Sequence, residues 1–176
     1  MIILVGASAS GKTEVAKLLY EKYGIEKMTT TTTREKRINE IDGRDYFFIT
    51  VEKFKQLERD NCFVETTCYN NNYYGSNKDQ IAKNRSIVVD PKGLKAYLDL
   101  KNPIIKTFVL TASENTRFNR MLVRGDKLSN AKERIAKDRI EFASEKVKDA
   151  EHFIQTDNLS IEEVADIIYN IYKKEL

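Results

Sequence analysis

Short apolar runs alternate along the chain with stretches whose apolar positions recur at helical spacing. The runs predict strands at residues 2–5, 28–33, 46–49, 62–69, 87–89, 104–110 and 153–154. The helical spacing predicts helices from Gly11 to Gly24, at 51–59, at 76–83, from Thr111 or Ser113 to Gly125, at 131–148, and at 161–172. This alternation is typical of an α/β fold with a parallel sheet.

The first apolar run leads directly into a glycine-rich stretch. It matches the pattern G-x-x-x-x-G-K-[ST] in full, as Gly6, Ala7, Ser8, Ala9, Ser10, Gly11, Lys12 and Thr13. Small residues let several backbone N–H groups face one hollow, and the following helix aims its positive end there. We expect a nucleoside triphosphate site in which Lys12 reaches the β and γ phosphates and Thr13 ligates Mg²⁺. The alternative is an ordinary Gly/Ser-rich turn.

Composition narrows the class of protein. The 176 residues suit one domain, and 41% hydrophobic with 32% charged residues is typical of a globular chain. The net charge of +3 comes from 30 basic and 27 acidic residues spread along the chain, so it indicates neither a nucleic-acid nor a membrane partner. No apolar run approaches a membrane-spanning length, and the first strand leaves no room for a signal peptide. We expect a cytoplasmic monomer or homodimer.

Three residues of types that often carry chemistry are expected to be structural. Cys62 and Cys68 are too far apart for a Cys-x-x-Cys motif and suit half-buried strand positions in a reducing compartment. His152 has no partner pattern for metal binding or base catalysis.

A second set of spaced motifs fills the middle of the chain. They are Thr31-Thr32-Thr33-Arg34-x-x-Arg37-x-x-Glu40-x-x-Gly43-x-Asp45-Tyr46-x-Phe48, Phe63-x-Glu65 and Asn72-Tyr73-Tyr74-Gly75-Ser76. They resemble the acceptor-site signature of guanylate kinases, and the resemblance extends through Asp90-Pro91-Lys92-Gly93 to the basic region after Phe118. It implies transfer of the γ-phosphoryl group of MgATP to GMP or dGMP, with Mg²⁺ as the metal.

The resemblance implies an acceptor site of cations, phenols and hydroxyls. The clamp on the acceptor phosphate would consist of Arg34, Arg37, Tyr46 and Tyr74. Glu65 would accept the N1 and N2 donors of guanine, which adenine lacks. The remaining acceptor contacts would come from Thr30, Gly75, Ser76 and Asp90. The alternative is a solvated basic loop with two core tyrosines and an exposed strand carboxylate.

The resemblance also implies an arginine lid. The segment Arg120-Met121-Leu122-Val123-Arg124-Gly125, followed by Arg134 and Arg139, is similar to the lid of the family. Arg124 and Arg134 would contact the transferred phosphoryl group, while Arg120 would lie nearer the donor ATP. The catalytic residues would be Lys12, Arg34, Arg124 and Arg134. Arginines at such intervals also occur on helices that are merely solvated.

The expected architecture is a P-loop NTPase-type parallel sheet with an inserted small mixed sheet and a helical lid. The core would comprise residues 1–32, 77–123 and 138–176, the acceptor-binding region 33–76 and the lid 124–137.

Three departures from the family pattern stand out. Val88 occupies a position where an acid is usual, which leaves Mg²⁺ with Thr13, water and Asp90 acting through water. The interval between Tyr74 and Asp90 is short for the helix expected there, and residues 154–157 lack the family's Asn near the adenine.

Two other functions remain open at this point. One is a non-catalytic guanylate-kinase-like interaction module, against which the intact Lys12-Thr13 pair argues. The other is a related kinase of a sugar phosphate such as ribose phosphate, against which the base-reading set of Glu65, Ser76 and Thr30 argues.

Overall fold

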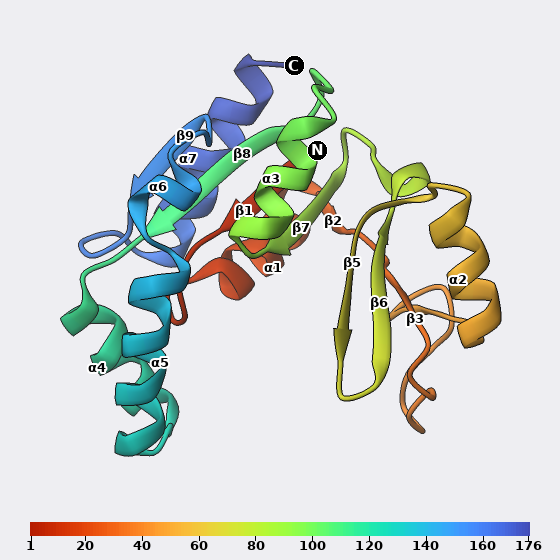
Figure 1. Cartoon of the computed structure of the whole chain (residues 1–176). Coiled ribbons are helices and arrows are strands. Elements are labelled where there is room, and N and C mark those ends of the chain that lie inside the picture. Colours follow the sequence, from red (N-terminus) through yellow and green to blue (C-terminus); the bar gives the residue numbers. More distant parts are fainter.

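Ile2–Val5 (β1), a run of four fully buried apolar residues, is the middle strand of a five-stranded sheet in the computed structural model, which describes residues 1–176 (Figure 1). The strand order is β2-β7-β1-β8-β9, and every neighbouring pair is parallel. The other strands are Glu26–Lys27 (β2), Arg85–Val89 (β7), Lys106–Thr111 (β8) and His152–Gln155 (β9). The predicted α/β fold with a parallel sheet is confirmed.

Helices cover both faces of this sheet, because successive residues of β1 point to opposite sides. Ile2 and Leu4 share a core cluster with α1 and α7, whereas Ile3 and Val5 share another with α3 and α6. The four helices are Lys12–Tyr23 (α1), Ile161–Lys174 (α7), Pro91–Asp99 (α3) and Ser144–Val147 (α6). A strand buried on both faces requires apolar residues at every position, which explains the uninterrupted first run.

A second, four-stranded sheet is inserted between β2 and β7, and its strand order is β4-β3-β6-β5. The strands are Phe47–Phe48 (β4), Thr31–Thr32 (β3), Asn72–Asn77 (β6) and Phe63–Tyr69 (β5). β3 pairs in parallel with β4 and antiparallel with β6, so the sheet is mixed. Val51–Arg59 (α2) packs on it through Phe54, whose ring stacks on Phe63 at a centroid distance of 4.7 Å.

Two further helices lie on the opposite side of the large sheet from the second sheet (Figure 1). They are Glu114–Arg124 (α4) and Leu128–Glu141 (α5), and they pack together through Met121, Ala131 and Ile135. Gly125, with φ of 98°, ends α4 in a backbone conformation that favours glycine. None of the helices has the length and apolar character needed to cross a membrane.

The predicted helix at residues 76–83 is wrong. The chain there continues β6 to Asn77 and makes only a single 3₁₀ turn, Lys78–Gln80, before β7. The last residues of β6, Ser76 and Asn77, pair with β5, and this pairing outweighs their helical spacing. A Cβ on Gly75 would lie 2.7 Å from the Phe63 ring, so the strand also needs glycine at that point. The short interval between Tyr74 and Asp90 follows, because no helix fills it.

Other predicted boundaries change for tertiary reasons. Of the strand expected at 28–33, only Thr31–Thr32 forms a strand, β3 of the second sheet, and β2 of the large sheet ends before it at Lys27. The helix expected at 131–148 begins earlier, at Leu128, and breaks after Glu141. Helix α3 was not predicted, although its signal is present: Asp90 caps it and Pro91 occupies its first turn.

The cysteines and the histidine form neither a disulfide nor a metal-binding cluster. Cys62 is half-buried just before β5, whereas Cys68 is exposed, contrary to the prediction, and both thiols are free. His152 stacks on Phe108 at 4.9 Å and faces Glu175.

Candidate active site

The loop between β1 and α1 is held in a shape that only certain residues permit. A Cβ on Gly6 would lie 2.4 Å from the Leu110 carbonyl oxygen, so any other residue would push the loop off β8. Gly11 caps α1 with φ of 98°. The N–H groups of the first turn of α1 have no partner within the helix, and they face the loop.

Side chains hold four successive carbonyl oxygens of this loop. The bonds are Lys12 Nζ to Ala7 O at 2.9 Å, Arg117 Nη1 to Ser8 O at 3.4 Å, Arg120 Nη1 to Ala9 O at 3.3 Å and Thr156 Oγ1 to Ser10 O at 3.3 Å. In a trans peptide the N–H points opposite to the C=O. The N–H groups of Ala9 and Gly11 therefore point away from these donors, and with the start of α1 they are donors that can bind an anion.

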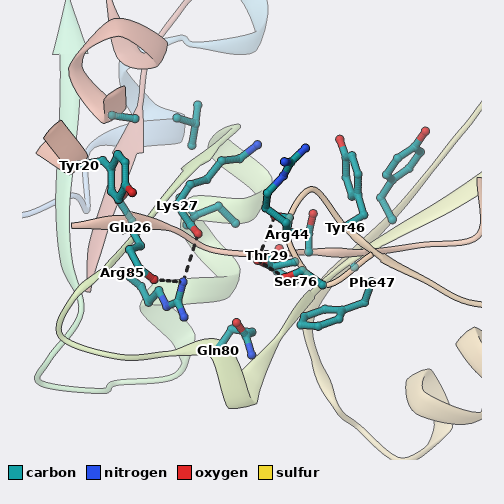
Figure 2. Close-up of a pocket in the computed structure, with 18 of the residues that line it drawn as sticks. Tyr20, Glu26, Lys27, Thr29, Arg44, Tyr46, Phe47, Ser76, Gln80 and Arg85 are labelled. Atoms are coloured by element: carbon teal, nitrogen blue, oxygen red, sulfur yellow. Dashed lines mark hydrogen bonds and ion pairs between the residues drawn. The ribbon is translucent and has the colours of Figure 1, made fainter. Parts of the chain in front are cut away.

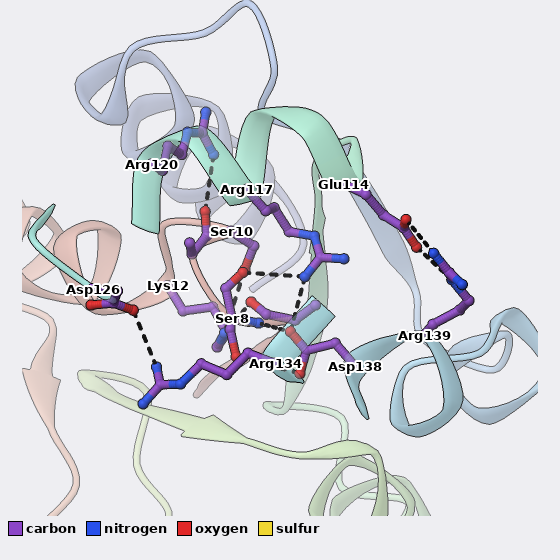
Figure 3. Close-up of polar contacts among 12 residues, drawn as sticks. Ser8, Ser10, Lys12, Glu114, Arg117, Arg120, Asp126, Arg134, Asp138 and Arg139 are labelled. Atoms are coloured by element: carbon purple, nitrogen blue, oxygen red, sulfur yellow. Dashed lines mark hydrogen bonds and ion pairs between the residues drawn. The ribbon is translucent and has the colours of Figure 1, made fainter. Parts of the chain in front are cut away.

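Two buried charges beneath the loop were missed by the sequence analysis. Arg117 on α4 donates to Asp138 Oδ2 on α5 at 2.9 Å, and their side chains are only 6% and 7% exposed (Figure 3). A signal was present: Arg117 precedes Met121 by one helical turn, and Asp138 follows Ile135 on the buried face of α5. A charge on the apolar side of a predicted helix indicates a buried partner.

Lys12 and Thr13 lie where the loop pattern predicts. Partial burial lowers the pKa of Lys12 to about 8; the nearby Asp138 raises it and Arg117 lowers it. The Thr13 side chain is exposed and lines a large cavity. No cluster of three or more His, Cys, Asp or Glu side chains forms a metal site. A single hydroxyl nevertheless suits Mg²⁺, which keeps several waters and binds substrate phosphates.

The cavity of about 1110 Å³ that Thr13 lines lies between helix α1 and the second sheet (Figure 2), and Thr13 is the one residue of the phosphate-loop motif that lines it. Its walls include six residues of the predicted acceptor site: Thr30, Tyr46, Glu65, Tyr74, Gly75 and Ser76. Val88 also lines it, so no carboxylate stands at that position. Asp90 does not line it: its Oδ1 accepts from the Gly93 N–H at 2.8 Å at the start of α3, and the side chain lines the neighbouring groove.

The structure brings three of the four expected clamp residues together. The Tyr46 and Tyr74 rings are 6.1 Å apart, and the Arg34 guanidinium lies 5.6 Å from the Tyr46 ring centroid. Glu40 holds that guanidinium, with Nη2 2.6 Å from Oε1. Arg37 lies apart, exposed, and only its backbone N–H binds Glu40.

Glu65 points into the cavity from β5. Its Oε1 accepts from Ser76 Oγ at 3.3 Å, and a Cβ on Gly93 would lie 2.9 Å from its Oε2. Burial, followed by the negative charge of Asp90, raises the pKa of Glu65. The site thus contains a partly desolvated carboxylate that can accept donors from a planar ring.

The lid arginines divide into two groups. Arg124 and Arg134 both pair with Asp126, at 2.7 Å and 3.9 Å, and their side chains are about half exposed. Figure 3 shows the pair of Arg134 with Asp126. Arg120 is held against the loop instead, and it donates to Thr156 Oγ1 at 3.1 Å and to Thr156 O at 2.7 Å. The first group is paired at the surface with Asp126, whereas Arg120 positions the loop itself.

Comparisons with known proteins agree on one family. The family model described as Guanylate kinase matches residues 1–175. The guanylate kinase of Mycoplasma mobile is 35% identical, with 100% of this chain and 93% of the relative covered. That of Mesomycoplasma hyopneumoniae strain J is 33% identical, with 100% and 95% covered. The crystal structure of guanylate kinase from Anaplasma phagocytophilum matches the fold with a TM-score of 0.66 at 22% identity, over 99% of this chain and 85% of that one.

Proposed function

We propose how the residues of this chain transfer a phosphoryl group from ATP to GMP. That reaction is the one catalysed by guanylate kinases, the family of nucleoside monophosphate kinases to which the chain belongs. The observation that carries the proposal is the cavity shared by Thr13 of the phosphate loop and Glu65, Tyr74 and Ser76 of the second sheet. Phosphoryl transfer needs little covalent chemistry from the protein, and it needs two anionic substrates in line. A single cavity between the two binding elements supports that arrangement.

We infer that residues 6–13 bind the triphosphate of ATP. Backbone N–H groups at the loop and at the start of α1 would bind phosphate oxygens, and Lys12 would neutralise the β and γ phosphates. Mg²⁺, with Thr13 as its protein ligand, would neutralise further phosphate charge. Because Asp90 caps α3 and lines another groove, we propose that it contributes less to the metal than the family pattern suggests.

The acceptor would lie against the second sheet. The Glu65 carboxylate would accept from N1 and N2 of guanine, and the hydroxyls of Ser76 and Thr30 would supply the remaining base contacts. Arg34, with Tyr46 and Tyr74, would bind the acceptor phosphate, and Glu40 already holds Arg34 in place. Nothing in this set requires a ribose 2′-hydroxyl, so dGMP is expected to be an acceptor as well.

Charge that develops on the transferred group would be stabilised from the lid. Arg124 and Arg134 come from different helices and converge on Asp126. An anion on the loop would compete with Asp126 for both guanidinium groups. Movement of α4 and α5 toward the second sheet would then exclude water and protect ATP from hydrolysis.

The decisive test is ADP release with MgATP and each of GMP, dGMP, AMP, UMP, CMP and ribose 5-phosphate. Turnover is expected with GMP and dGMP, because only guanine offers the two adjacent donors that Glu65 can accept. Faster turnover with AMP or the sugar phosphate would contradict the acceptor assignment. A lack of turnover with every acceptor would favour a non-catalytic binding module.

Replacing Arg34 by lysine is expected to raise the KM for GMP about 10- to 100-fold, because a point charge loses the forked bonds that a guanidinium makes with phosphate. The KM for ATP should stay within about twofold of the wild-type value, since ATP binds elsewhere. Arg59→Lys, at the exposed end of α2, is the matched control. Equal changes in both KM values would remove Arg34 from the clamp.

The exposed Arg37 tests whether the loop rearranges around GMP. If the Arg37 side chain turns into the site when GMP binds, Arg37→Ala is expected to raise the KM for GMP as much as Arg34→Lys does. A GMP titration that matches the wild type would exclude Arg37 from the clamp.

The pH dependence of GMP use should report the protonation of Glu65. Its pKa lies above the ordinary 4.5, so the carboxylate takes up a proton before the pH has fallen to that value. The protonated carboxyl group cannot accept both guanine donors. The value of kcat/KM for GMP should therefore fall as the pH decreases through the raised pKa of Glu65. Glu65→Gln should lack this component of the acid limb. Because the same substrate is used for both proteins, titration of the GMP phosphate cancels, and identical acid limbs would contradict the assignment.

A further inference from the structure

We propose that Arg117 and Asp138 are positioning residues that hold the phosphate loop and helix α5 in one catalytic arrangement. With Ser8 they form a three-part contact, here called the clasp. Neither side chain needs to touch a substrate. The proposal rests on the proposed function, since it takes the phosphate loop to be the ATP site.

The clasp joins three segments that are far apart in the chain (Figure 3). Asp138 Oδ2 on α5 accepts from the Ser8 N–H at 2.8 Å and from Arg117 Nη1 at 2.9 Å, and Oδ1 faces Ser8 Oγ at 3.3 Å. Arg117 Nη1 on α4 also donates to Ser8 O at 3.4 Å. The peptide groups on both sides of Ser8 are thus held by one ion pair.

Packing alone does not account for this pair. Met121, Ala131 and Ile135 already join α4 to α5, and an exposed pair, Arg139 with Glu114, links the same helices at the surface. A buried ion pair is often no more stabilising than apolar residues of the same volume. What the buried pair adds is control over the orientation of Ser8.

Orientation matters because it decides which loop donors remain for phosphate. The Ser8 N–H donates to Asp138, so it is not available to bind a phosphate oxygen. The N–H groups of Ala9 and Gly11 are left for the substrate. Arg117 neutralises the Asp138 carboxylate, so a negative charge close to Lys12 does not repel the triphosphate.

The clasp also couples the loop to the lid. Arg134 precedes Asp138 by four residues, which is about one turn of α5. The contact of Asp138 with Ser8 therefore sets how far along the loop Arg134 lies. Displacements of about 1 Å at such a site cost on the order of 100-fold in rate, so a loosened α5 should lower kcat even with ATP bound.

The two halves of the clasp should give different kinetic signatures. Asp138→Leu removes every acceptor for Ser8 but leaves the Arg117 cation, so kcat should fall about 10- to 100-fold while the KM for ATP does not rise. Arg117→Met leaves an unpaired carboxylate beside the phosphates, so the KM for ATP should rise at least about tenfold. The KM for GMP should be unchanged in both variants.

A charge-swapped variant separates positioning from stability. Arg117→Asp with Asp138→Arg can re-form an ion pair between α4 and α5, but a guanidinium cannot accept the Ser8 N–H. The thermal midpoint should recover relative to the single variants, whereas kcat should not. Recovery of both would show that the pair is only structural and would overturn the proposal.

The control is Glu114→Gln, which breaks the exposed pair between the same two helices without touching the loop, and its kcat should match the wild type. An equal loss in Glu114→Gln and Asp138→Leu would also overturn the proposal. If Asp138→Leu does not fold, Arg117→Lys keeps the charge balance and tests the same point: kcat should fall without a rise in the KM for ATP, and unchanged kinetics would count against the clasp. Failure of the wild type to consume ATP with GMP would instead refute the proposed function.

Discussion

Replacing Lys12 by methionine is expected to lower kcat about 10³-fold, and to raise the KM for ATP, because the ammonium group stabilises charge that spreads over the transferred phosphoryl group. Methionine keeps the length and most of the volume of the side chain. The variant loses the bonds from Nζ to Ala7 O and Ser10 Oγ, but the loop carbonyls of Ser8, Ala9 and Ser10 stay tethered. A folded and inactive protein is therefore expected.

The measurement is GMP-dependent ADP release, with the thermal midpoint of each variant as a check of folding. Lys22→Met is the matched control, since Lys22 lies at the other end of α1 and pairs only with Asp166 at the surface. Undiminished ATP consumption by Lys12→Met would refute the assignment of the phosphate loop. Equal losses in both lysine variants would point to a general effect on α1.

Glu65→Gln is expected to lower kcat/KM for GMP about 10²- to 10³-fold, because the amide replaces one of two charged acceptors by a donor that opposes the guanine N–H groups. The KM for ATP should be unchanged, since Glu65 faces only the acceptor side of the cavity. IMP lacks the exocyclic amine of guanine and so tests the contact directly. The wild-type preference for GMP over IMP should collapse in the variant.

Glu58→Gln provides the control for this carboxylate. Glu58 lies on α2 beside the same sheet, and it accepts from Thr66 and pairs with Lys55 away from the cavity. Its loss should leave both substrates unaffected. If Glu65→Gln weakened ATP and GMP equally, or kept the GMP preference, then guanine would be read by other groups.

Local patterns account for most of the fold. The apolar run at β1, the loop at residues 6–13 and the helix that follows it were predictable because period and turn residues act over short distances. The wrong predictions for the strand at 28–33 and the helix at 76–83 have a common cause. The strand at 28–33 shortens to Thr31–Thr32 because the chain passes there from one sheet to the other, and residues 76–77 stay extended because they pair with β5. Such pairing is a property of distant partners, which local propensity does not contain.

The candidate site also contains features that the sequence predicts and features that depend on packing. Its spaced motifs identify the residue types that a phosphate and a guanine require, namely Arg34, Glu65 and the lysine of the loop. They do not tell that Arg37 lies exposed or that Asp90 caps α3 instead of lining the cavity. Those outcomes depend on where loops and helix starts pack.

The sequence by itself therefore determined the parallel sheet, the phosphate loop and the family to which the chain belongs. Only the tertiary structure decided which groups hold the loop in shape. Asp138 reaches Ser8 across 130 residues and Arg117 across 21, and no periodicity links such positions. Two opposite charges become partners because packing of α4 on α5 excludes water between them, so that each can satisfy only the other and the loop.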